Sequence, residues 1–292
     1  PLMGSWIDGH TVPFGLIGSP VGHSGSPAMY NYCFEKDGLN CVYLAFEVDL
    51  KTLDAGMKAI RALHFKGINI TMPCKSAAVQ YADECTKAVR LIGATNCMIC
   101  ENGKWIAHNT DGIGYVNNLK AHGVDVKGKK VTLIGGGGAG MAILVQCALS
   151  GAKEISVFNI RDAFIGNLEE RAELINREVS GCTVRVFDLA DQEKLKAEIA
   201  DSQILTNATR VGMAPQDQSM AVPDVSVFHK GLVVADTVYN PRETRLIREA
   251  RAAGCLGVEG IGMLVRQGEA AYQIFTSKAM PVEEVQKKFF ET

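Results

Sequence analysis

The run Gly135-Gly136-Gly137-Gly138-Ala139-Gly140 constrains the fold of this chain most, because it separates two apolar segments. Residues 129–134 predict an apolar strand and residues 139–150 an apolar helix, so the glycines form the turn between them. The first, third and sixth residues of the run satisfy G-x-G-x-x-G in the strand–turn–helix context that this motif requires. Such a turn brings backbone amides close to a pyrophosphate at a helix N-terminus. An ordinary strand–helix turn, or the glycine-rich turn of a methyltransferase, would also fit these residues.

The uncharged stretch from Val131 to Ala152 is long enough to suggest a membrane span. Four consecutive glycines in its middle argue against a continuous helix, so a buried strand, a turn and a buried helix explain it better. Further strands are expected at 154–159, 183–187, 203–206 and 232–236, with helices between them. This alternation predicts a Rossmann-type, doubly wound parallel sheet.

The first 112 residues predict a second α/β lobe with a mostly parallel sheet. Strands are expected at 13–19, 42–48 and 67–71, and helices at 27–37 and 53–63. An antiparallel hairpin over 96–107 should turn at Asn102-Gly103, since Asn-Gly supplies the positive φ of such turns. The tail, 263–290, is expected to be helical and to return to this lobe.

These segments predict two domains. A substrate-binding catalytic domain would comprise residues 1–112 and 261–292, and a dinucleotide-binding domain residues 113–260.

Composition excludes several classes of partner. A formal net charge of −2 without a Lys/Arg run argues against nucleic-acid binding, and no charged-then-apolar signal segment opens the chain. Nine cysteines without a framework spacing indicate thiols in a reducing cytoplasm. Cys97 and Cys100 form a C-x-x-C with no second pair, which favours two strand cysteines over a zinc or redox site. No metal and no membrane partner are expected.

The segment Asn159-Ile160-Arg161-Asp162 follows the strand after the glycine turn, where a Rossmann domain reads the adenosine ribose. Asp162 could accept hydrogen bonds from both ribose hydroxyls of NAD and would repel a 2′-phosphate. Arg161 could do the reverse. We therefore expect NAD, with NADP possible; a solvated Arg-Asp pair at a helix start is the alternative.

Ser24 and Ser26 form a second constellation. Ser26 followed by Pro27 predicts an N-cap and a first helical residue. The two hydroxyls beside a helix N-terminus would suit a carboxylate, although capping alone would explain Ser26 equally well.

Polar residues gather where the strand at 67–71 ends. Asn69 and Thr71 should point to one face, so both could reach one bound ring, and Pro73 should end the strand and leave Lys75 on the usual ligand side. Two more polar loops contain Asn96 and Asp111. An ammonium, an amide and a carboxylate in one place could hold and deprotonate a polyol.

Seven motifs occur in order over nearly the whole chain. They are Ser24-x-Ser26-Pro27, Asn69-x-Thr71-x-Pro73-x-Lys75, Gly93-Ala94-x-Asn96, Asn109-Thr110-Asp111-Gly112, the glycine run, Val238-Tyr239-Asn240-Pro241, and Gly260-x-Gly262-Met263-Leu264-x-x-Gln267. Together they resemble the shikimate dehydrogenase family, and Asn159-x-Arg161-Asp162 is most similar to its quinate/shikimate dehydrogenase branch.

The resemblance implies an enzyme of the chorismate pathway of aromatic amino acid biosynthesis. It would oxidise shikimate to 3-dehydroshikimate, or quinate to 3-dehydroquinate, reversibly and with NAD or NADP. The catalytic residues would be Lys75 and Asp111. The substrate would be held by Ser24, Ser26, Thr71, Asn96, Tyr239 and Gln267. The cofactor would be held by Gly136, Gly137, Gly138, Ala139, Asn159, Arg161, Asp162, Arg210, Val238 and Gly260.

Some residues depart from the usual family pattern. Gly25 replaces a bulky residue, which predicts a looser serine loop. Gly136 and Gly140 replace larger residues, which we expect to loosen the glycine turn without removing a backbone contact. A non-catalytic NAD- or quinate-sensing protein of the same fold is the alternative function, and both a monomer and a homodimer stay open.

Overall fold

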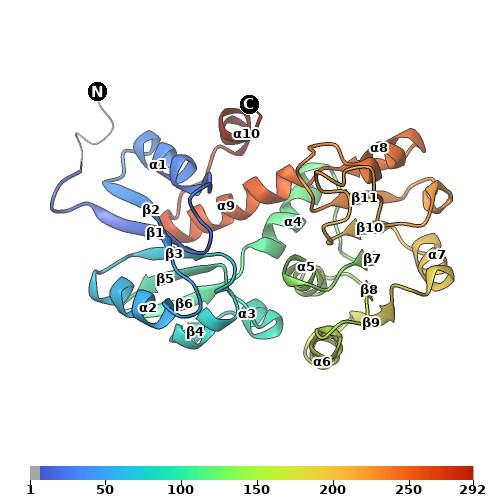
Figure 1. The fold of residues 1–292 in the computed structure, drawn as a ribbon, viewed down its shortest axis with the longest axis horizontal. Coiled ribbons are helices and arrows are strands. Elements are labelled where there is room, and N and C mark those ends of the chain that lie inside the picture. The colour runs from blue at the N-terminus through green and yellow to red at the C-terminus, as the bar shows by residue number, and fades with distance from the viewer. Residues whose placement is uncertain (1–6, 292) are drawn as a thin grey trace. The chain divides into compact units, whose positions relative to one another are not determined.

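The computed structural model describes residues 7–291 and divides into two compact units (Figure 1). Unit 1 comprises residues 1–110 and 268–292, and unit 2 comprises residues 111–267. Helix α9 (Ile261–Thr276) contributes residues to both units. The functional assignment of the two predicted domains stays a prediction.

Unit 1 contains a six-stranded sheet in the order β2-β1-β3-β5-β6-β4. Its strands are β1 (Val12–Gly18), β2 (Cys41–Glu47), β3 (Gly67–Ile70), β4 (Glu84–Cys85), β5 (Cys97–Glu101) and β6 (Lys104–His108). β1 is parallel to β2 and β3, so the carboxyl ends of these three strands lie at the same end of the sheet. The predicted hairpin is confirmed as β5–β6, and its turn has φ of 51° at Asn102 and 80° at Gly103.

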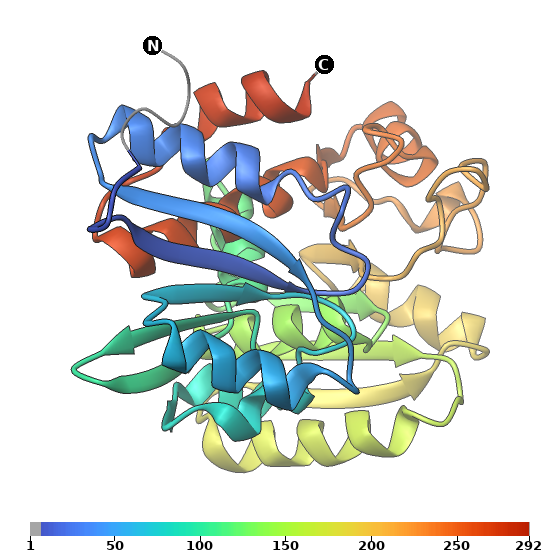
Figure 2. The same ribbon diagram turned by 60° about the vertical axis from the view of Figure 1, so that its left-hand side comes forward.

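Helices cover both faces of this sheet (Figure 2). They are α1 (Ser26–Lys36), α2 (Leu53–Ala62), the 3₁₀ helix η1 (Ala77–Tyr81), α3 (Lys87–Ile92), the second half of α9, and α10 (Val282–Phe290). On one face α2 packs Met57 and Ile60 into a core with Ile68 and Ile70 of β3. On the other face α1 and α9 contribute aromatic rings. The rings of Tyr30 and Tyr272 are stacked, with 6.3 Å between their centroids.

The tail does pack on unit 1, as expected, and Figure 2 shows α10 beside α1. The tail is helical, as expected, but residues 277–281 divide it into α9 and α10. Ser277 adopts a left-handed φ of 60° and Pro281 precedes α10. Because proline cannot occupy a helix interior without losing a hydrogen bond, the chain forms two helices instead.

Unit 2 contains the predicted doubly wound sheet, in the order β12-β11-β10-β7-β8-β9. Its strands are β7 (Lys130–Ile134), β8 (Glu154–Asn159), β9 (Thr183–Asp188), β10 (Ile204–Asn207), β11 (Val233–Asp236) and β12 (Leu256–Val258), all paired in parallel. The chain reverses its direction across the sheet between β7 and β10, the point where such folds bind ligands.

The helices of unit 2 are α4 (Asp111–Ala121), α5 (Gly138–Leu149), α6 (Ile165–Glu178), α7 (Gln192–Ala200), η2 (Val225–Val227) and α8 (Arg245–Ala252). The uncharged stretch forms β7 and α5, and eight of the twelve residues of α5 are buried. A helix that is apolar all round belongs in a protein interior or a membrane. Within residues 7–291, no helix combines the length and apolar character needed to cross a bilayer.

Candidate active site

Three polar segments of unit 1 meet at the carboxyl end of β3. The Thr71 amide donates to the Ile17 carbonyl at the end of β1, at 2.9 Å. The Ile70 amide donates to the Asn96 carbonyl at 2.9 Å, and the Thr95 amide donates to the Lys75 carbonyl at 2.9 Å. These backbone bonds bring the segments of Thr71, Lys75 and Asn96 to one place.

The turn after β3 fixes the Lys75 backbone. The Cys74 amide donates to the Thr71 carbonyl at 3.0 Å, and the buried Cys74 thiol donates to the Val48 carbonyl at 3.4 Å. The turn is thereby fastened to the segment that follows β2. Lys75 itself is partly buried.

Asn96 is paired with Thr110 in the interior of unit 1. Its Oδ1 accepts from the Thr110 amide at 2.8 Å, and its Nδ2 donates to Thr110 Oγ1 at 2.9 Å. Asn96 and Thr110 are 4% and 0% exposed. The pair sets the orientation of the Asn96 amide and holds the residue directly before Asp111, the first residue of α4.

A buried tyrosine connects the serine loop to this cluster. The Tyr43 hydroxyl donates to Asn69 Oδ1 at 2.9 Å. Asn69 Nδ2 in turn donates to the Asn96 carbonyl at 3.1 Å. Burial raises the pKa of Tyr43 well above its usual value, although the Ser26 side chain acts to lower it, so the hydroxyl stays protonated.

The structure defines the surroundings of Asn69 and corrects the expectation for Ser26. Asn69 is buried, and its amide group links the Tyr43 hydroxyl to the backbone of Asn96. Ser26 is the first residue of α1 rather than its N-cap, because Gly25 at φ −78° and ψ −7° occupies the cap position. Ser24 Oγ accepts from the Ser26 amide at 3.2 Å.

Sequence reasoning missed Tyr43 and the pairing role of Thr110. A polar ring in the middle of the apolar strand β2 was a signal for the first. Nothing local signalled the second, since Thr110 and Asn96 are fourteen residues apart.

The glycine turn of unit 2 fits a pyrophosphate. A Cβ on Gly137 or Gly138 would meet nothing within 4 Å, so the backbone there is open to a ligand at the N-terminus of α5. Gly135 has φ of 98°, and a Cβ on Gly140 would lie 2.0 Å from the Gly135 carbonyl oxygen. Gly140 therefore gives a tight turn, contrary to the expected loosening.

The end of β8 is tied to this turn. Asn159 Oδ1 accepts from the Gly136 amide at 2.9 Å. Asp162 Oδ1 accepts from the Phe164 amide at 3.0 Å, and Arg161 Nε donates to Asp188 Oδ2 at 3.0 Å. Arg161 and Asp162, the two residues expected to contact the ribose, are both exposed. They follow Asn159, which is bonded to the glycine turn.

Two neighbouring loops follow β10 and β11 (Figure 1). Asp236, the last residue of β11, accepts from Asn207 Nδ2 of β10 at 3.0 Å and from the Val238 amide at 2.9 Å. Arg210 is exposed on the first loop. On the second loop Val238 is buried, whereas Tyr239 is 47% exposed.

Gly260 and Gln267 complete the predicted set in unit 2. A Cβ on Gly260 would lie 2.5 Å from the Val238 carbonyl oxygen, so glycine permits the close approach of these two loops. Gln267 is partly buried on α9 and donates from Nε2 to the Leu264 carbonyl at 3.0 Å.

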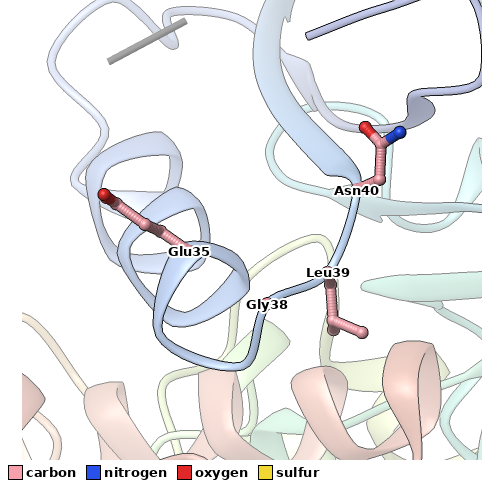
Figure 3. Close-up of a pocket in the computed structure, with 4 residues that line it drawn as sticks. All are labelled: Glu35, Gly38, Leu39 and Asn40. Atoms are coloured by element: carbon pink, nitrogen blue, oxygen red, sulfur yellow. The ribbon is translucent and has the colours of Figure 1, made fainter. Parts of the chain in front are cut away.

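A hollow of about 350 Å³ lies elsewhere in unit 1, against Glu35, Gly38, Leu39 and Asn40 (Figure 3). Asn40 immediately precedes β2, so this hollow lies at the amino end of a strand. Thr71 and Lys75 follow the carboxyl end of β3. Because β2 and β3 are both parallel to β1, this is the opposite end of the strands of the same sheet. The hollow is therefore separate from the polar cluster.

All nine cysteines are free thiols, and Cys97 and Cys100 both lie on β5. Residues three apart on a strand face opposite sides, so the two do not form a pair. Within the described part of the chain, no group of three His, Cys, Asp or Glu side chains could hold a metal ion.

The chain combines a Rossmann-type unit that has an open glycine turn with an α/β unit that has a lysine-bearing polar cluster. This combination is typical of an oxidoreductase that depends on a nicotinamide dinucleotide. The family model "Shikimate dehydrogenase substrate binding domain" matches residues 16–98, and "Shikimate 5'-dehydrogenase C-terminal domain" matches residues 260–288.

Curated relatives extend over nearly the whole chain. A shikimate dehydrogenase (NADP(+)) of Listeria innocua is 44% identical over 284 residues, 97% of each chain. A quinate/shikimate dehydrogenase of Escherichia coli is 42% identical over 273 residues, 94% of each. The crystal structure of shikimate 5-dehydrogenase from Listeria monocytogenes, in complex with shikimate and NAD, is 44% identical with a TM-score of 0.94 and coverage of 97% and 98%. The chain belongs to the shikimate dehydrogenase family.

Proposed function

We propose that this chain reversibly oxidises shikimate to 3-dehydroshikimate and quinate to 3-dehydroquinate, with NAD or NADP as the hydride acceptor. The observation that supports this most is the convergence of the Thr71, Lys75 and Asn96 segments at one strand end. The named activities of the relatives agree with it.

The polar cluster of unit 1 suits a polyhydroxylated acid. Ser24 and Ser26 at the start of α1 would hold the carboxylate, where the helix N-terminus favours negative charge. Thr71 and Asn96, together with Gln267 and Tyr239, would hold the ring hydroxyls and the ring itself. The pairing of Asn96 with Thr110 supports this role, because an amide fixed in advance loses little entropy on binding.

Lys75 and Asp111 would perform the proton transfer. As the C3 hydrogen leaves with its electron pair, the hydroxyl proton passes to the Lys75 amine, and the C3–O bond becomes a carbonyl. Asp111 would hydrogen-bond the same hydroxyl and orient the amine. When bound, the nicotinamide supplies the hydride acceptor.

The cofactor would lie along the carboxyl ends of β7, β8, β10 and β11. The turn from Gly136 to Ala139 would hold the pyrophosphate, chiefly at Gly137 and Gly138, where the backbone is open. Asn159 would support the turn by accepting from the Gly136 amide. Arg161 and Asp162 would meet the adenosine ribose, Arg210 the adenine side, and Val238 and Gly260 the nicotinamide. We propose a preference for NAD, because Asp162, which follows the end of β8, would repel a 2′-phosphate.

The test is reduced-nicotinamide absorbance with each acid paired with each cofactor. Activity with at least one of the four pairs is expected, and no signal with any pair would favour the non-catalytic alternative. Lys75→Ala should lower kcat about 1,000-fold with the cofactor Kd unchanged, which lies within the usual range for a general base. Exposed Lys51→Ala is the matched control. Near-normal turnover of Lys75→Ala would refute the assignment.

We also propose a cytoplasmic location and a homodimer. The free state of all nine cysteines agrees with a reducing compartment. The homodimer is supported by β2, an edge strand with Leu44 50% and Phe46 37% exposed. Light scattering should give twice the chain mass, and a monomer mass at micromolar concentration would contradict it.

A further inference from the structure

The carboxyl end of β9 contains an acidic residue that the proposed mechanism does not use. Asp188 is the last residue of β9, and its Oδ2 accepts from Arg161 Nε at 3.0 Å. Its other oxygen, Oδ1, accepts from the Ala190 amide at 2.9 Å. The carboxylate is thus oriented by its own loop and directed at the guanidinium.

The two loops that present these side chains are joined through their backbones. The Leu189 amide donates to the Asn159 carbonyl at 2.9 Å, and Asn159 Oδ1 accepts from Gly136 in the glycine turn. Through Leu189 and Asn159, Asp188 is therefore linked to the turn that we propose for the pyrophosphate, although 52 positions of sequence separate it from Gly136.

Stability does not explain this ion pair well. The side chains of Arg161 and Asp188 are 67% and 31% exposed, and exposed pairs of this kind contribute little to folding. Their position at the ends of β8 and β9, beside the proposed ribose site, suggests a role in binding instead.

We propose that Asp188 is a specificity-determining residue for the cofactor, which holds Arg161 in an ion pair and so disfavours the 2′-phosphate of NADP. This inference rests on the proposed cofactor site. A 2′-phosphate would have to compete with Asp188 for Arg161 and would also meet the negative charge of Asp188 itself. NAD has no such phosphate, so its binding is insensitive to this competition.

The ionisation of Asp188 agrees with this role. The hydrogen bond from the Ala190 amide, together with that from Arg161, holds the pKa of Asp188 below its usual value. The carboxylate is therefore charged at neutral pH. Asp162, whose Oδ1 accepts from Phe164, adds a second carboxylate at the end of β8.

The decisive variant is Asp188→Asn, which removes the charge while its Oδ1 can still accept from Ala190. We expect kcat/KM for NADP to rise about fivefold, as for removal of one surface charge near a phosphate. The value for NAD should change less than about twofold. Glu193→Gln is the matched control, because this carboxylate on α7 is 90% exposed and should leave the NAD/NADP ratio unchanged.

The double variant Arg161→Gln/Asp188→Asn tests whether Asp188 acts through Arg161. The NADP gain should be smaller in the Arg161→Gln background, and the gain in the single variant should shrink at high salt. An unchanged NAD/NADP ratio in Asp188→Asn, or equal gains with and without Arg161, would overturn the inference. Absence of turnover by the parent protein with every acid and cofactor would instead refute the proposed function.

Discussion

Asp236→Asn should change the pH dependence of stability of unit 2. Asp236 is 3% exposed at the end of β11. Its carboxylate accepts from Asn207 Nδ2 at 3.0 Å, from the Val238 amide at 2.9 Å and from Thr244 Oγ1 at 2.7 Å. Burial nevertheless outweighs these hydrogen bonds and raises the pKa of Asp236 from 3.8 to about 6.

The sign of the effect follows from proton binding. Between the unfolded pKa and the folded pKa, the folded protein binds more protons than the unfolded chain, so the unfolding free energy falls as pH rises. For the two pKa values above, the loss between about pH 4.5 and 7.5 is about 2 kcal/mol. Asparagine cannot titrate, so Asp236→Asn should not show this loss.

The measurement is urea unfolding at a series of pH values, followed by far-UV circular dichroism. Trp105 is buried in unit 1, and no tryptophan follows it in the sequence, so its fluorescence reports on unit 1 separately. Relative to the parent, Asp236→Asn should gain about 2 kcal/mol in unfolding free energy between those pH values. Exposed Asp125→Asn is the control. Parallel pH curves for Asp236→Asn and the parent would refute the reasoning.

Three further outcomes are expected. Gly140→Ala should weaken NAD binding at least tenfold in calorimetry, because its Cβ would lie 2.0 Å from the Gly135 carbonyl oxygen; Gly166→Ala, where a Cβ meets nothing within 4 Å, should not. Thr110→Val should lower kcat/KM for shikimate about tenfold through loss of the bond to Asn96 Nδ2, with KM for NAD unchanged. Glu198→Gln should destabilise unit 2 by about 3 kcal/mol at pH 7. Despite burial, hydrogen bonds from Lys130, Ser156 and Lys194 lower the pKa of Glu198 to about 2, so in urea unfolding this difference should fade from pH 4.5 toward pH 2.

Local chemistry explains which parts of the fold could be predicted. Asn102-Gly103 favours a hairpin turn through its own backbone preferences, and a glycine run between an apolar strand and an apolar helix predicts a strand–turn–helix unit. Short elements were missed for the opposite reason. α3 has six residues and β12 three, too few for a periodic pattern.

Long-range pairing explains what could not be predicted in the candidate site. α4 begins at Asp111 in a segment that reads as a polar loop, and its packing depends on distant partners, since a Cβ on Gly114 would lie 2.6 Å from the Gln267 amide nitrogen. Likewise, the pairing of Asn96 with Thr110 and of Arg161 with Asp188 joins residues on different elements. The sequence motifs predicted which side chains form the candidate site, but only the folded structure shows the hydrogen-bond partners that orient them.

The two units hold their polar side chains by the same physical means. In unit 1, Tyr43 and Thr110 fix Asn69 and Asn96 from within the protein. In unit 2, Asp236 fixes Asn207 and the backbone of Val238 in the same way. Its carboxyl group is buried there, which raises its pKa. A buried polar group that is fully hydrogen-bonded adds rigidity more than net stability. Substitutions at these supporting residues should therefore reduce turnover or ligand binding more than they reduce stability, although none of them needs to touch a ligand.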